Sequence, residues 1–87
     1  MLIRSQDKKD LINLDKVTRL AAGKVYGQNE TDWLIEVERQ LSIGQYSSEA
    51  KAIKVLDMIQ DAYARFCAGN TYSDAVFQMP SDEEVEG

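Results

Sequence analysis

Residues 48–67 read SEAKAIKVLDMIQDAYARFC, and this stretch decides the fold class. At about 100° per residue, its apolar side chains fall on one side of a helix and most of its charged side chains fall on the opposite side. The stripe comprises Ala52, Val55, Leu56, Ile59, Tyr63 and Phe66, and the opposite side carries Lys54, Asp57, Asp61 and Arg65. Ser47 or Ser48 offers an N-cap oxygen, and Gly69 can end the helix in a left-handed conformation. The stretch predicts an amphipathic helix whose stripe covers a small β-sheet.

Before the helix, the period of the apolar residues changes to two. Trp33, Ile35 and Val37 alternate with Leu34, Glu36 and Glu38, which predicts a half-buried strand over 33–37. A second strand is predicted over 41–46. Residues 38–40 would then form a tight connection, although Glu-Arg-Gln is poor turn chemistry. A single bent strand over 32–46 is the alternative.

Further short strands are predicted at 2–5, 11–14, 17–26 and 74–79, the last one ended by Pro80. The segment 27–30, Gly-Gln-Asn-Glu, predicts a turn, and Gly23 indicates a bulge or a close backbone approach. The order is β-β-β-β-β-α-β. Because consecutive strands joined by short turns favour antiparallel pairing, we expect an antiparallel meander sheet of five to six short strands. The predicted class is α+β, with one amphipathic helix near the C-terminus.

The chain of 87 residues is long enough for one domain, which we place at residues 1–80. Charge is unevenly distributed along it: residues 1–24 carry a net +3, residues 25–80 a net −4 and residues 81–87 another −4. Since like charges repel and resist burial, we expect 81–87 to be a disordered acidic tail.

One helix covers only part of a sheet of this size, so either the sheet curls into a half-barrel or a second molecule covers the rest. Five apolar residues lie where the predicted helix does not reach, and they are the candidate interface: Ile12, Leu14, Leu34, Ile53 and Met58. Packing inside a curled sheet is the alternative for the same five residues. If the five residues form an interface, we expect a homo-oligomer or a protein partner.

Several function classes are disfavoured by composition. A nucleic-acid binder usually carries a dense basic stripe, and this chain shows none. No segment is apolar for long enough to span a membrane, and the N-terminus does not resemble a signal peptide. Cys67 stands alone, which fits a reducing cytoplasm, and we expect it to be a half-buried structural thiol. Because the chain has no His and no set of converging polar residues, we expect no catalytic, cofactor or metal site.

Several segments resemble a group of small uncharacterised proteins of Gram-positive bacteria and their prophages. The resembling segments are Ile3 to Asp7, Leu11 to Leu14, Ile43 to Ala52, Val55 to Ile59, and Val76 to Pro80. The resemblance implies a bacterial, cytoplasmic and phage-related protein, and it brings no catalytic residues with it. The small segment Ala21-Ala22-Gly23 departs from the bulkier strand that the group would lead us to expect.

The leading hypothesis is a non-enzymatic interaction or structural module that associates with itself. The alternative is a domain that binds a small ligand or a peptide, either in a pocket between sheet and helix or at an open strand edge.

Overall fold

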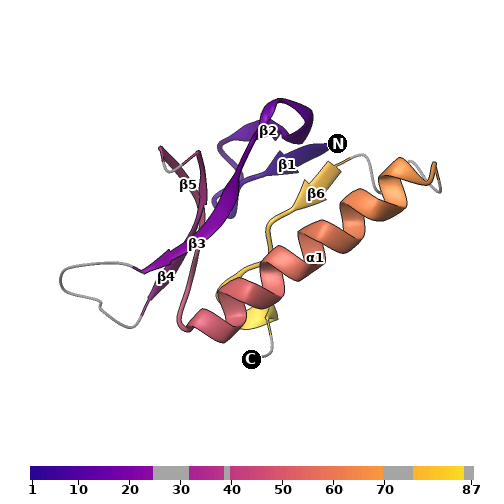
Figure 1. Ribbon diagram of the computed structural model, residues 1–87. Helices are drawn as coiled ribbons and strands as arrows, with labels where there is room; N and C mark the ends of the chain where they lie inside the picture. The colour runs from indigo at the N-terminus through magenta and orange to yellow at the C-terminus, as the bar shows by residue number, and fades with distance from the viewer. Residues whose placement is uncertain (25–31, 39, 70–75, 86–87) are drawn as a thin grey trace.

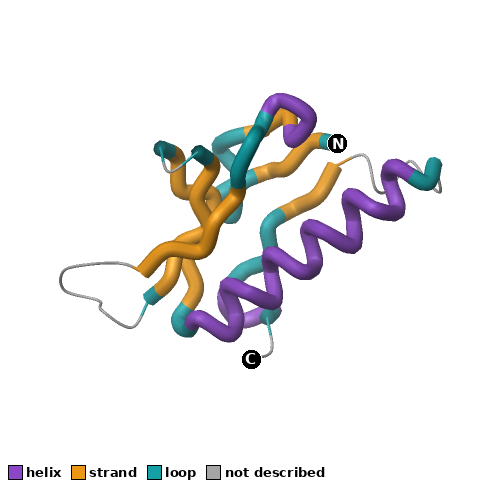
Figure 2. The backbone as a smooth tube through the Cα atoms, viewed as in Figure 1, coloured by secondary structure: helices purple, strands orange, loops and turns teal. Residues whose placement is uncertain are grey.

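The computed structural model describes residues 1–24, 32–38, 40–69 and 76–85. These residues form one long helix and two small sheets, so the α+β class is confirmed. Sheet A has the strand order β2 (Leu11–Asn13), β1 (Leu2–Arg4) and β6 (Val76–Gln78). Sheet B has the order β3 (Leu20–Lys24), β4 (Trp33–Val37) and β5 (Leu41–Tyr46). Both sheets lie on the same side of α1 (Glu49–Cys67), as Figures 1 and 2 show.

Helix α1 forms where the apolar period predicted it. Ser48 is the N-cap, and its side chain accepts a hydrogen bond from the backbone N–H of Lys51 at 3.2 Å. Gly69 follows the helix with φ +74°, the left-handed conformation expected of a glycine at a helix end. The residues of α1 that are buried are Ala52, Val55, Ile59 and Ala62. Two predictions at the C-terminal end were wrong. Tyr63 is 36% exposed, because it reaches out to Asp15 instead of into the core, and Cys67 is exposed.

Strands β4 and β5 form an antiparallel hairpin in which Val37 pairs with Leu41. Residues 38–40 are therefore a tight connection and not the middle of one bent strand, although residue 39 lies outside the described residues. Glu38 adopts a left-handed conformation, with φ 56°, which is uncommon for a residue other than glycine. Its carboxylate accepts hydrogen bonds from the backbone N–H groups of Thr18 and Arg19 and from the Thr18 hydroxyl. These contacts stabilise a turn that the local sequence Glu-Arg-Gln does not itself favour.

The pairing of β4 with β5 contains a bulge. Ile35 pairs with Gly44 while Glu36 pairs with Ser42, so Ile43 is the extra residue. Gly23, where a bulge or a close approach was predicted, pairs regularly with Leu34. A Cβ at Gly23 would lie 2.6 Å from the Glu36 carboxylate, so what approaches Gly23 is a side chain.

The prediction of one antiparallel meander was wrong. The 3-10 helix η1 (Leu14–Lys16) follows β2, and the next strand, β3, belongs to the other sheet. The remaining edge of β1 pairs in parallel with β6, which comes from the far end of the chain. Helix α1 therefore lies in mid-chain and not near the C-terminus, since β6 and a 3-10 helix follow it. Parallel pairing of this kind depends on a long-range contact that no local pattern encodes.

The other predicted strands are present but shorter. Strand β1 ends at Arg4, β2 ends at Asn13 and β3 begins at Leu20, each inside its predicted range. The outer residues predicted for β3 and β6 at 25–26 and 74–75, and the predicted turn at 27–30, lie outside the described residues.

Gln6 joins the two sheets. Its backbone N–H donates to the Ile43 carbonyl at 2.8 Å, and its side-chain oxygen accepts from the Gln45 N–H at 2.9 Å. Its side-chain nitrogen donates to the carbonyls of Gln45 and Pro80, each at 3.1 Å. Because Gln6 follows β1 and its partners include two residues of β5, this one residue ties sheet A to sheet B.

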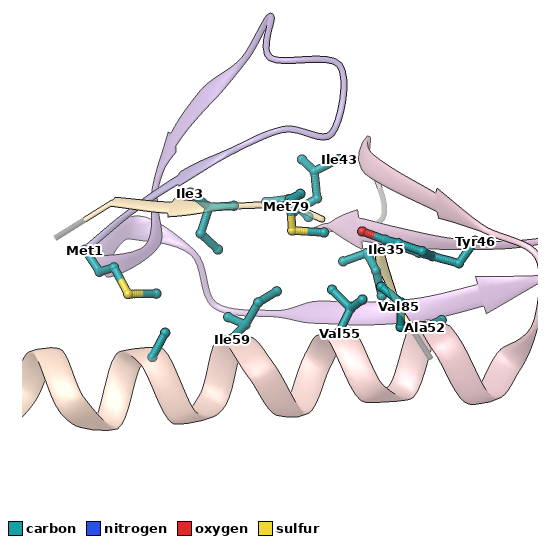
Figure 3. Packing of buried hydrophobic residues seen from close by; sticks show 12 residues of the cluster. Met1, Ile3, Ile35, Ile43, Tyr46, Ala52, Val55, Ile59, Met79 and Val85 are labelled. Carbon is teal, nitrogen blue, oxygen red and sulfur yellow. The ribbon is translucent and has the colours of Figure 1, made fainter. Parts of the chain in front are cut away.

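The core lies between α1 and the two sheets, as Figure 3 shows. Sheet A contributes Ile3. Sheet B contributes Ile35, Val37, Ile43 and Tyr46. Helix α1 contributes Ala52, Val55, Ile59 and Ala62, and the ends of the chain contribute Met1, Met79 and Val85. Both sheets and the helix therefore share one apolar core.

The C-terminal residues differ from the predicted disordered tail over 81–85. Asp82–Glu84 form the 3-10 helix η3, and Val85 is only 4% exposed. The Tyr46 hydroxyl donates to the Pro80 carbonyl at 2.8 Å, and Asp82 accepts from the Ser47 N–H at 2.8 Å. These contacts and the burial of Val85 offset the repulsion between the acidic side chains. Residues 86–87 lie outside the described residues.

Candidate functional site

A groove runs between α1 and the segment that leads from η1 into β3. Its volume is about 580 Å³, within the range of roughly 300–1,000 Å³ typical of ligand sites. One wall is formed by Leu56, Ile59, Gln60 and Tyr63 of α1, and the other by Leu14, Asp15, Val17, Thr18, Arg19 and Leu20. The groove is open to solvent along one side. Its walls are mostly apolar, and a few polar groups stand among them.

Asp15 and Tyr63 connect the two walls at one end of the groove. The Tyr63 hydroxyl donates a hydrogen bond to Asp15 Oδ1 at 3.2 Å. The other carboxylate oxygen of Asp15 lies 3.5 Å from the Met1 ammonium. Hydrogen bonds to Cys67 and to Asp15 raise the pKa of Tyr63, so the hydroxyl keeps its proton and remains a donor at neutral pH. This bridge joins the two walls toward the C-terminal end of α1 and occupies the carboxylate of Asp15.

Arg19 and Gln60 are the polar lining groups with uncommitted side chains. Neither side chain forms a hydrogen bond or an ion pair with another residue in the described ranges, although both line the groove. They belong to opposite walls, Arg19 to the segment before β3 and Gln60 to α1. The neighbouring Thr18 hydroxyl is already engaged by Glu38. Hydrogen bonds from the Thr18 side chain and from the Thr18 and Arg19 backbone lower the pKa of Glu38.

The five predicted interface residues lie on different faces of the molecule. Ile12 is half-buried and packs against the core from sheet A, where it pairs with Ile3. Leu14 lines the groove. Leu34 is half-buried and belongs to sheet B. Ile53 is 47% exposed and Met58 is 37% exposed, but they lie five residues apart on α1, roughly 140° around the helix at about 100° per residue. They do not form one surface, and only Leu14 reaches the groove. The use of these residues as an interface stays a prediction.

The sequence pattern missed most of the groove. Val17, Arg19 and Leu20 were only part of the predicted strand over 17–26, and Gln60 was given no role. The available signal was the break in strand pattern at Asp15-Lys16, which η1 occupies. Only the folded chain shows that the segment after this break runs beside α1.

A second hollow is polar. It is lined by Gln6, Asp32, Gln45, Tyr46, Ser47, Ser81, Asp82 and Glu83. Its groups largely satisfy one another: Gln45 donates to Asp32 at 2.6 Å, and Lys51 lies 3.4 Å from Asp82. We assign it to the attachment of the C-terminal segment.

Glu36 and Glu38, the acidic residues that alternate with the apolar residues of the predicted strand, have separate surroundings. Glu36 is half-buried in β4 beside Gly23, whereas the exposed Glu38 is held by Thr18 and Arg19. Their carboxylates therefore form no working pair. Among the described residues, no three His, Cys, Asp or Glu side chains are grouped as metal ligands would be. The same part of the chain contains no helix with the length and apolar character needed to cross a membrane.

Comparison of the chain with protein-family models, with curated proteins and with solved structures gives no match. The resemblance to small proteins of Gram-positive bacteria and their prophages therefore stays a prediction. The central feature of the candidate site is the apolar groove with two polar side chains, Arg19 and Gln60, that are not engaged by other described residues.

Proposed function

We propose that this protein is a non-enzymatic binding module that takes up an apolar ligand in the groove between α1 and residues 14–20. The observation that carries the proposal is the groove itself. It is built from side chains of α1 and of residues 14–20, and its apolar walls leave partly buried surface such as Leu56, Leu14 and Val17 in contact with water. Covering such surface is favourable by roughly 25 cal/mol per Å².

The absence of a catalytic constellation among the groove residues supports binding over catalysis. The titratable groups that line it are Asp15, Arg19 and Tyr63. Asp15 and Tyr63 are bound to each other, which leaves neither poised as a general base or acid. Nucleophilic catalysis would need a Ser, Thr or Cys beside a base, and Thr18 instead donates to the carboxylate of Glu38 outside the groove lining.

Titration with 1-octanol, followed by amide chemical shifts, tests the proposal. We expect shifts confined to the residues that line the groove, with a dissociation constant on the order of 1 mM, because the ligand has few atoms. Gln60→Trp should abolish these shifts, since a large side chain at this exposed position fills the groove. Asp57→Trp, on the solvent side of α1, is the matched control and should bind like the wild type. Shifts scattered over the surface, or none at all, would reject the proposal.

Self-association is the second candidate, and the outward face of sheet A favours it. Leu2 of β1 pairs with Val76, and Arg4 of β1 pairs with Leu11. Ile3, which lies between Leu2 and Arg4, is buried on the face of the sheet that points into the core. The alternation of a strand therefore places Leu2, Leu11 and Val76 outward, and Leu11 and Val76 are 57% and 48% exposed. A second copy could cover these side chains, although three residues make a smaller patch than stable dimers bury.

Sedimentation velocity over a range of protein concentrations tests this second candidate. We expect the wild type to show a concentration-dependent shift toward dimer, and Leu11→Lys to remove it. Gln40→Lys, in the exposed turn between β4 and β5, adds the same charge elsewhere and should leave the shift in place. A wild type that sediments as a monomer at all concentrations would exclude self-association.

A further inference from the structure

We infer that the natural ligand of the groove is a small amphipathic carboxylate, an apolar chain that ends in one carboxylate group. The inference depends on the proposed function and makes it specific. It follows from three features of the groove: which of its charges are already paired, where the bridge between Tyr63 and Asp15 lies, and how long its apolar walls are.

The charge balance of the groove favours an anion. Asp15 is the acidic lining residue, and its two oxygens already contact the Tyr63 hydroxyl and the Met1 ammonium. Arg19 is the basic lining residue, and its guanidinium has no hydrogen bond or ion pair with another residue of the described ranges. The uncommitted charge in the groove is therefore positive. An arginine matches a carboxylate because its planar group donates two parallel hydrogen bonds.

Glu38 is the nearby anion that could compete for Arg19. Its carboxylate instead accepts from the Thr18 N–H at 2.7 Å, from the Thr18 hydroxyl at 2.7 Å and from the Arg19 N–H at 2.9 Å. These hydrogen bonds satisfy Glu38 and leave the guanidinium of Arg19 available. Gln60, on the opposite wall, carries an amide nitrogen that can donate a further hydrogen bond to the same carboxylate.

The bridge between Tyr63 and Asp15 sets the direction of the ligand. Tyr63 and Asp15 bridge the two walls at the C-terminal end of α1, and the negative Asp15 disfavours a second carboxylate there. The carboxylate therefore lies toward Arg19, and the apolar chain points toward the bridge along Leu14, Val17 and Ile59.

The length of the walls favours a small molecule over a peptide. The helix wall extends from Leu56 to Tyr63, which spans roughly 10 Å at about 1.5 Å per residue. A wall of this length would contact only about three residues of an extended peptide, at roughly 3.3 Å per residue. An alkyl chain of the length of octanoate matches a wall of this length.

Three probes of equal chain length test the inference: octanoate, 1-octanol and octylammonium, each kept below its micelle concentration and followed by amide chemical shifts. We expect octanoate to bind about tenfold more tightly than octanol, and octylammonium to bind most weakly. Arg19→Glu should remove the advantage of octanoate over octanol, so that the two probes bind with similar dissociation constants. Lys54→Glu, which makes the same charge change on the solvent side of α1, should leave the order of the probes as in the wild type.

The outcomes separate this inference from the proposed function. Equal binding of octanoate and octanol would overturn the carboxylate while the binding module stands. Failure of all three probes to shift the groove residues would overturn both. Persistence of the octanoate advantage in Arg19→Glu would show that Arg19 is not the anchor and would overturn the inference as stated.

Discussion

Two residues show how single positions hold the β4–β5 hairpin. Glu38 keeps its left-handed conformation, with φ 56°, through hydrogen bonds from Thr18 and Arg19. Gly44 lies beside the bulge, where a Cβ would stand 2.9 Å from the Tyr46 ring and 3.1 Å from the Met79 methyl. Both neighbours are buried in the core, so neither can move away easily.

Gly44→Ala is expected to destabilise the protein by about 1–3 kcal/mol, because an added methyl group overpacks a core that has no room for it. Gly23→Ala is the matched control. A Cβ there meets the end of the Glu36 side chain, which can rotate away. The free energy of unfolding from urea titration, with Trp33 fluorescence as the signal, measures both. An equal cost at the two glycines would contradict the packing argument.

At the level of elements, the C-terminal segment is attached to the first turn of α1. Asp82 accepts from the Ser47 N–H at 2.8 Å, and Lys51 Nζ lies 3.1 Å from the Asp82 carbonyl and 3.4 Å from its carboxylate. The hydrogen bond from the Ser47 backbone, ahead of the interaction with Lys51, lowers the pKa of Asp82 below its ordinary 3.8. The negative charge also lies near the N-terminus of a helix, where it is favourable.

The lowered pKa fixes the direction of a pH effect on this attachment. Since the folded state holds the Asp82 proton less tightly than the unfolded state, the contribution to stability is present above pH 3.8. It is lost as the pH falls through the lowered pKa. We expect the protection of the Glu84 and Val85 amides against hydrogen exchange to fall over this acidic range. Asp82→Asn should show weak protection already at neutral pH, and an unchanged profile in this variant would contradict the assignment.

At the level of the whole molecule, Gln6 adds hydrogen bonds between the two sheets to the apolar core that they share. The residue makes four hydrogen bonds to Ile43, Gln45 and Pro80, among them one across 74 positions in the sequence. Sheet A and sheet B share a core, but their strands do not pair with each other. Gln6 thus takes the place of the strand pairing that a continuous sheet would have.

Gln6→Ala is expected to lower the free energy of unfolding by about 2 kcal/mol, since three side-chain hydrogen bonds are lost at a net cost of roughly 0.5–1.5 kcal/mol each. Gln40→Ala serves as the control, because this glutamine is exposed in the turn between β4 and β5. Thermal unfolding of the two variants compares them directly. Similar melting temperatures would show that the apolar core alone holds the sheets together.

The local sequence predicted those elements whose signal lies within a few residues. Helix α1 was recognisable from its apolar period, from Ser48 as a cap and from Gly69 at its end. Strands β4 and β5 were recognisable from alternation, and their bounds at Trp33–Val37 and Leu41–Tyr46 match the prediction. Each of these patterns reflects side-chain spacing along one continuous element, so the sequence by itself determined them.

The tertiary structure decided what depends on distant partners. The pairing of β1 with β6, the attachment of Asp82 to α1, and the position of Arg19 beside Gln60 in the groove lining join segments far apart in the chain. The spacing of apolar residues and the composition show which face of an element is apolar, but they do not identify the element that packs against this face. The α+β class and the single helix were therefore readable from the sequence, whereas the split sheet, the ordered C-terminal residues and the groove emerged only from packing.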